Sequence, residues 1–98
     1  MARRNQSRQI QPVYGPRKAF GQALREFRDA KGISQERLAT DAGVDRSYVS
    51  LVERGIQGPT IQAVVKFAKA LAVKPSEIVR RMEEILAEIE NPPKTGEE

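Results

Sequence analysis

The chain has 98 residues, a formal net charge of +4, no cysteine and no histidine. This length suits a single domain. The missing residue types exclude disulfides, thiolate metal sites, cysteine nucleophiles and histidine-based catalysis. No apolar run reaches the roughly 18–20 residues that span a bilayer, and Arg3 and Arg4 are not followed by an apolar signal segment. We therefore expect a cytoplasmic protein with no membrane partner.

Charge is distributed unevenly along the chain. The first 18 residues hold five basic side chains and no acidic one, whereas residues 83–98 hold six acidic side chains and one basic side chain. A basic end and an acidic far end favour a molecule that meets a polyanion with one pole. The alternative interpretation is that both ends are solvated tails.

Residues 1–15 are predicted to form a flexible basic arm. They contain few large apolar side chains, so they cannot bury enough surface to order themselves. A first helix begins at Pro16, because proline at the first helical position has no N–H to leave unpaired, and Gly32 ends this helix. Its apolar stripe consists of Phe20, Ala23, Leu24 and Phe27.

The segment 34–55 is predicted to form two short helices around a glycine turn. Ser34 can cap the helix 35–42 through its hydroxyl, and Asp45 can cap the helix 46–54 through its carboxylate. Gly43 ends the first of these helices, where a left-handed residue is usually required. Two helices joined in this way are typical of a helix-turn-helix, whose second helix lies in the DNA major groove.

Two further helices follow the motif. Thr60 can cap the fourth helix, and the fifth helix is expected over residues 75–90. It ends at Asn91, because a residue that precedes proline avoids the helical conformation. We expect an acidic disordered tail over residues 91–98. The predicted fold class is all-α, with five helices in one domain over residues 16–90.

The fifth helix carries a long apolar seam. Ile78, Met82, Ile85 and Ile89 follow a 4-3-4 spacing, and Leu86 widens the seam. The far half lies beyond any sequence left in the globule to cover it, and an exposed apolar patch normally marks an interface. We expect a homodimer with Met82, Ile85, Leu86 and Ile89 at its interface. The alternative is a helix that folds back onto its own domain.

Several positions of the motif and of the fourth helix carry residues typical of one known family. They are Gln35, Ala39, Gly43, Val49, the run Glu53–Arg54–Gly55, Thr60–Ile61 and the run 70–73. With them, residues 20–82 resemble the lambda-repressor-like, Cro/cI-type helix-turn-helix family, also called the xenobiotic-response-element family. The resemblance implies a regulator encoded by a bacterium or phage. The hexapeptide 45–50 is similar to controller proteins of restriction–modification systems, although the same pattern occurs in other regulators, such as phage-type repressors.

The first turn of the predicted recognition helix presents Arg46 and Ser47. Arginine can give two parallel hydrogen bonds to guanine, and serine can donate or accept. The resemblance puts base contacts at these positions and at Leu51, one helical turn further on. Leu51 departs from the polar residue often found there, and it either contacts a thymine methyl group or packs at the protein–DNA boundary. The alternative for Arg46 is a solvated charge.

Candidates for phosphate contacts surround the recognition helix. Gln35 lies at a helix N-terminus, where its amide and the free N–H groups can both face a phosphate. Tyr48 either places its hydroxyl on the DNA backbone or covers the turn with its ring. The candidates are Gln35, Tyr48, Ser50, Arg54 and Gln57 around the motif, and Arg3, Arg4 and Arg8 in the arm.

The resemblance also implies a structural ion pair. In similar phage repressors, residues at the places of Arg28 and Glu53 form a partly buried ion pair that fixes the recognition helix. Glu36 and Asp41 lie where related phage activators meet a sigma subunit of RNA polymerase. That match is partial, and solvated surface acids are the alternative.

The leading hypothesis is a transcription regulator that binds a palindromic double-stranded operator as a homodimer. The alternative is an antitoxin that neutralises a toxin and autoregulates its operon. No nucleophile–base pair or glycine-rich phosphate loop is present in the sequence, so no catalytic residues are predicted and the protein is not expected to be an enzyme. No cofactor, metal or small-molecule ligand is implied.

Overall fold

The structure of the protein, a computed structural model, describes residues 15–90. Within this range the chain forms five helices and no strand, so the predicted all-α class is confirmed. The helices are α1 (Pro16–Lys31), α2 (Gln35–Ala42), α3 (Arg46–Glu53), α4 (Ile61–Leu71) and α5 (Pro75–Glu90). The arm candidates Arg3, Arg4 and Arg8 and the predicted tail 91–98 lie outside the described residues. None of the five helices is long and apolar enough to cross a membrane.

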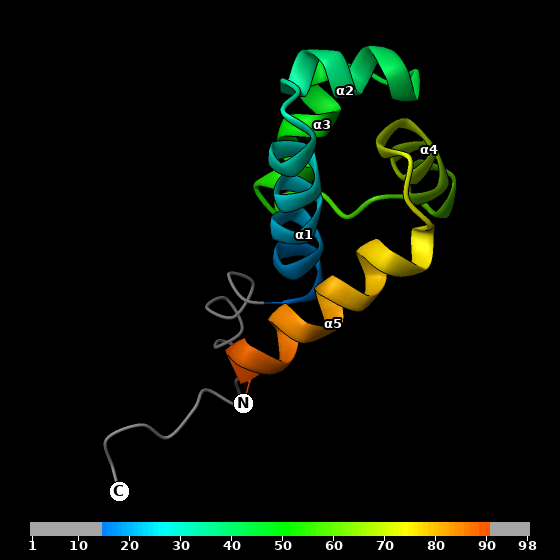
Figure 1. Ribbon diagram of the computed structural model, residues 1–98. Coiled ribbons are helices and arrows are strands. Elements are labelled where there is room, and N and C mark those ends of the chain that lie inside the picture. The colour runs from blue at the N-terminus through cyan, green and yellow to red at the C-terminus, as the bar shows by residue number, and fades with distance from the viewer. Residues whose placement is uncertain (1–14, 91–98) are drawn as a thin grey trace, which may run out of the picture.

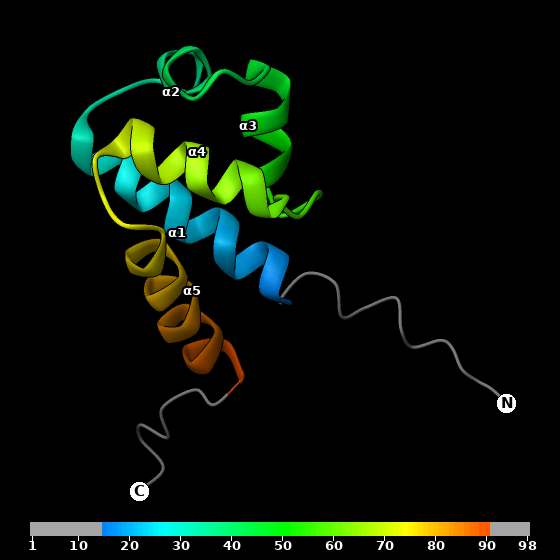
Figure 2. The same ribbon diagram turned by 90° about the vertical axis from the view of Figure 1, so that its right-hand side faces the viewer.

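The helices divide between two ends of the molecule (Figures 1 and 2). At one end α2 packs on α3 and α4, and at the other end α5 runs beneath α1. The central helix α1 contacts α3, α4 and α5, and its contact with α5 is the most extensive in the domain. This arrangement leaves α3 at the surface, held from behind by α1 and α2.

Most of the predicted helix boundaries are produced by the expected capping residues. The Ser34 hydroxyl accepts a hydrogen bond from the Arg37 N–H at 3.0 Å, and the Thr60 hydroxyl accepts one from the Ala63 N–H at 3.0 Å. Gly43 ends α2 with a left-handed backbone, φ 72°.

The prediction that the Asp45 carboxylate caps α3 with a hydrogen bond is wrong. Asp45 occupies the N-cap position of α3 with an extended backbone, but its side chain accepts no capping hydrogen bond. The first turn of α3 lies at the surface, where water can satisfy its free N–H groups without help from the carboxylate. These N–H groups are therefore not covered by the Asp45 side chain.

The core is formed by the apolar faces of all five helices. Its largest fully buried side chains are Leu24, Leu38, Val49, Val52, Phe67, Ile78 and Ile85. These side chains belong to one apolar cluster, in which α3 packs together with α1 and α4. The position of α3 is consequently set by the same core that stabilises the domain.

The prediction that Ile85 lies beyond the globule is wrong. Ile85 is 2% exposed and belongs to the core of the single chain, because α5 packs closely along α1. Met82, Leu86 and Ile89 are half-buried at the margin of that core. The larger apolar side chains of α5 that remain partly exposed are thus those three and Val79, and Ile85 is not available to a partner.

Candidate nucleic-acid interface

The recognition helix α3 turns its apolar side inward and its polar side to solvent. Val49 and Val52 are fully buried, whereas Arg46 and Ser47 are exposed in the first turn. Leu51 is half-buried, which keeps part of its side chain at the surface. The three predicted base-contacting side chains therefore all reach the surface on one short helix.

The end of α3 and the loop that follows carry three of the predicted phosphate contacts. Arg54 and Gln57 are exposed, and Ser50 is half-buried. The Arg54 guanidinium donates to the Ser50 hydroxyl at 3.4 Å. The loop itself is tied to α1, since the Arg17 guanidinium donates to the Ile56 carbonyl at 3.2 Å. Sequence reasoning missed this role of Arg17, because no helical spacing links two residues so far apart in the chain.

Tyr48 combines the two roles that the sequence left open. Its ring stacks on Phe67, with ring centroids 6.1 Å apart and planes at 20°. Its hydroxyl accepts a hydrogen bond from the Thr60 N–H at 3.2 Å, which connects α3 to the start of α4. The phenolic O–H can still donate to another acceptor, so the covering role and a phosphate contact are compatible.

Arg28 and Glu53 form a bidentate ion pair between α1 and α3. Arg28 Nε donates to Glu53 Oε2 at 2.6 Å, and Nη2 donates to Oε1 at 3.0 Å. The Glu53 side chain is 3% exposed, and that of Arg28 is 11% exposed. The hydrogen bond to the Glu53 carboxylate raises the pKa of Arg28 against the opposing effect of burial. Both charges are thus held at the back of the recognition helix.

Two further groups complete this polar cluster. The Arg28 Nη1 group donates to the Ile33 carbonyl at 2.8 Å, and the Gln35 amide donates to Glu53 Oε1 at 2.9 Å. The end of α3 is therefore linked to α1, to the α1–α2 turn and to the first residue of α2. The Gln35 amide keeps one N–H and its carbonyl oxygen for another partner. No spacing in the sequence predicts that Gln35 and Glu53 would meet.

A close approach of two backbones also fixes α3 against α1. A Cβ atom added at Gly21 would lie 2.6 Å from the carbonyl oxygen of Glu53 and closer still to that of Val52. Only glycine permits this distance between the helices. Gly21 therefore sets how deeply α3 sits on the domain.

The two acidic side chains of α2, Glu36 and Asp41, both lie at the surface. Asp41 accepts hydrogen bonds from the Arg37 guanidinium of the same helix, the shorter at 2.9 Å. Glu36 is exposed in the first turn. Both interpretations of these acids, as a solvated surface and as a contact for a sigma subunit, stay predictions.

Comparison with known proteins decides the family. Residues 24–78 match the helix-turn-helix family, and this match covers α2, α3 and α4 and parts of α1 and α5. The chain belongs to the Cro/cI-type helix-turn-helix family. The resemblance seen in the sequence is thereby confirmed.

Three relatives show how this family member compares with others. The chain is 38% identical to control protein C.BamHI of Bacillus amyloliquefaciens over 61% of its own length and 75% of the relative. It superposes on the restriction-modification controller protein C.AhdI from Aeromonas hydrophila with a TM-score of 0.62, 50% identity, and coverage of 63% and 94%. For the C.Esp1396I tetramer in complex with its operator, the TM-score is 0.67, identity 25%, and coverage 72% and 93%.

These findings confirm the class of protein predicted from the sequence. The relatives that the chain matches, among them helix-turn-helix transcriptional regulators of Bacillus subtilis, are regulators and not enzymes. The protein is a DNA-binding transcription regulator of the Cro/cI type.

Proposed function

We propose that the protein binds a palindromic double-stranded operator as a homodimer, with α3 of each protomer in the major groove. The observation that carries this proposal is that α3 is exposed at its start and anchored in the protein at its end. Its exposed first turn presents Arg46 and Ser47, and its buried end is fixed by Glu53. A reading helix must be held rigidly if its first-turn side chains are to meet base edges in one register.

Base readout is assigned to the exposed first turn and the next one. Arg46 gives two parallel hydrogen bonds to O6 and N7 of a guanine, and Ser47 donates to or accepts from an adjacent base. Leu51 contacts a thymine methyl group with the part of its side chain that reaches the surface. This assignment predicts sequence preference at two or three positions per half-site.

Phosphate contacts frame the recognition helix in this proposal. The free N–H of the Gln35 amide faces one phosphate at the start of α2, and the far side of the groove is served by the loop after α3. The assigned side chains are Gln35, Tyr48, Ser50, Arg54 and Gln57. Arg3, Arg4 and Arg8 extend the contacts along the DNA backbone or into a groove, at positions outside the described residues.

The homodimer is assigned to the apolar margin of α5. Met82, Leu86 and Ile89 are half-buried and lie along one helix, whereas Ile85 belongs to the core. An isologous contact between two such margins gives the twofold symmetry that a palindromic operator requires. The half-sites would then lie about 34 Å apart along the DNA.

Selection of bound fragments from genomic DNA, followed by sequencing, tests the operator. We expect a palindromic consensus that the Arg46→Ala variant binds more weakly. Recovery of fragments without a shared sequence would contradict specific recognition.

Sedimentation of the Ile89→Asp variant tests the dimer separately. A charge at this half-buried position of α5 should prevent the contact between protomers and give a folded monomer. A dimer that persists would place the interface on another surface.

A narrower function, control of a restriction–modification system, is favoured by one observation. The chain is 50% identical to the restriction-modification controller protein C.AhdI over 94% of that chain. We propose that the protein controls genes of a restriction–modification system. Selected genomic fragments that border restriction or modification genes would support this function, and a consensus site that lies next to no such gene would contradict it.

A further inference from the structure

One basic residue of α1 lies beside the recognition helix without a strong partner. Positions 21, 25 and 28 are spaced by four and three residues, so they share one stripe of α1. Gly21 meets the backbone of α3, and Arg28 binds Glu53 at the end of α3. Arg25 therefore lies between two points at which α1 touches α3.

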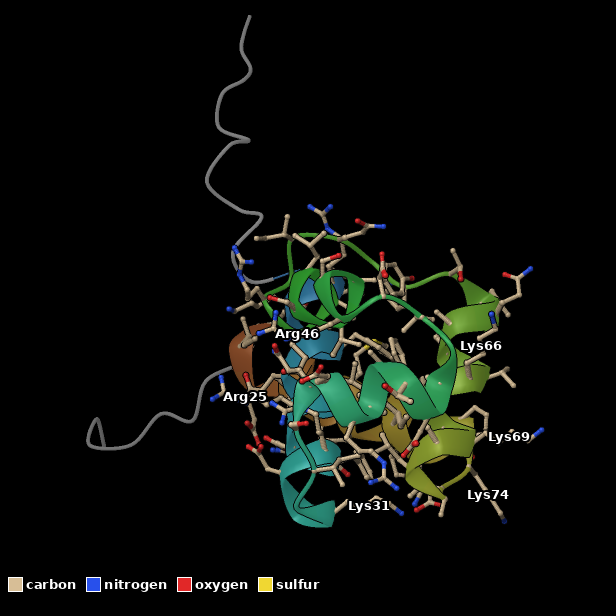
Figure 3. All side chains as sticks on the ribbon, turned by 90° about the horizontal axis from the view of Figure 1, so that it is seen from above. Arg25, Lys31, Arg46, Lys66, Lys69 and Lys74 are labelled. Carbon is tan, nitrogen blue, oxygen red and sulfur yellow. The ribbon has the colours of Figure 1, made fainter. Side chains whose placement is uncertain are left out.

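The Arg25 side chain is nevertheless open to solvent. It is 67% exposed, and its ion pair with Asp29 has a distance of 3.8 Å between Nε and Oδ2, with Asp29 itself 61% exposed. An exposed pair at this distance contributes little, so the guanidinium is free to turn to another anion. Figure 3 views the molecule from above, and in it Arg25 and Arg46 lie on the same side of the molecule, whereas Lys69 lies on the opposite side.

We infer that Arg25 binds a phosphate of the DNA backbone next to the groove that α3 enters. This inference rests on the proposed function, because it places the ligand against the DNA-facing side of α3. A guanidinium presents parallel N–H donors that fit two phosphate oxygens. Such a contact positions the protein and carries no information about base sequence. Arg25 thus adds α1 to the elements already assigned to phosphate binding, which are α2, α3 and the loop after α3.

The test compares Arg25→Ala with Lys69→Ala, which removes the same charge from the opposite side. The affinity of each protein is measured between 50 and 200 mM salt, for a duplex carrying the selected operator and for a duplex of random sequence. Removal of one phosphate contact per protomer lowers the slope of log affinity against log salt by about 0.9, or about 1.8 for a dimer. The ratio of wild-type to Arg25→Ala affinity should then fall about 12-fold over this salt range.

The expected result is this decrease in slope on both duplexes for Arg25→Ala, an unchanged slope for Lys69→Ala, and recovery by Arg25→Lys. Equal slopes for Arg25→Ala and the wild-type protein would overturn the inference. So would equal decreases for the two alanine variants, because they would show a general charge effect. A wild-type protein that binds the operator and the random duplex equally fails the proposed function instead, and that result is read before the variants are compared. Unchanged melting temperatures confirm that both variants are folded.

Discussion

Two arginine–glutamate bridges tie α1 to other helices, and they differ in burial far more than in length. Arg28 binds Glu53 of α3 at 2.6 Å, with side chains 11% and 3% exposed. Arg81 of α5 binds Glu26 at 2.7 Å, with side chains 31% and 42% exposed. The same kind of ion pair therefore links α1 to α3 at a buried position and links α1 to α5 at the surface.

The difference in burial assigns different roles to the two bridges. An ion pair removed from water is costly to break, because the remaining charge is left poorly solvated. An exposed pair is weak, because water and salt replace either partner. We conclude that the Arg28–Glu53 bridge fixes where α3 sits, whereas α5 is held by the apolar core that includes Ile78 and Ile85.

Removal of the buried carboxylate should have the largest effect on stability. The Glu53→Ala variant leaves the Arg28 guanidinium with the Ile33 carbonyl and with a longer contact, 3.7 Å, to the exposed carboxylate of Asp29. We expect the free energy of unfolding to fall by about 3–5 kcal/mol, measured by urea denaturation at a fixed protomer concentration. Glu83→Ala, at an exposed position of α5, is the control and should change it by less than about 0.5 kcal/mol. Similar values for the two variants would contradict the role of burial.

The second prediction concerns the core that holds α5. Ile85→Ala should lower the free energy of unfolding by about 3 kcal/mol, because it leaves a cavity at a fully buried position. Ile89→Ala, one helical turn further along at the half-buried margin, should cost about 1 kcal/mol or less. Urea denaturation of both variants decides the comparison. If Ile89→Ala proves the more damaging at every protomer concentration, the margin of α5 contributes to the core at least as much as Ile85 does.

The third prediction separates DNA binding from stability on a single helix. Arg46 is exposed at the start of α3, and Glu53 is buried at its end. We expect Arg46→Ala to leave the melting temperature unchanged and to weaken operator binding by about 1–3 kcal/mol. The preference at one symmetric pair of base positions should relax at the same time. Equal decreases in affinity for operator and random duplexes would show that Arg46 contacts a phosphate.

Much of this architecture follows from local patterns in the sequence. Caps such as Ser34, the terminating Gly43 and the apolar stripes predict all five helices, since each signal lies within a few residues of the boundary that it sets. Packing between helices is not encoded in this local way. The sequence did not indicate a packing partner for Ile85, because it does not show that α5 lies along α1. It also did not predict that the Gln35 amide would reach Glu53. A resemblance to known repressors supplied the pairing of Arg28 with Glu53, which spacing alone does not give.

The exposed bridge gives the smallest expected effect, and pH makes it measurable. A hydrogen bond from Arg81 lowers the pKa of Glu26 below its ordinary value, against a smaller opposing effect of burial. A carboxylate whose pKa is lower in the folded state stabilises the protein above its unfolded pKa of about 4.3, and this contribution disappears as the pH falls through the folded pKa. The Glu26→Gln variant should therefore be less stable than the wild type by at most about 1 kcal/mol at pH 7, because both side chains remain partly solvated. Urea denaturation between pH 7 and pH 3 should show the two proteins converging below about pH 4. A difference that does not narrow at all between pH 7 and pH 3 would mean that the Glu26 side chain acts through packing and not through its charge.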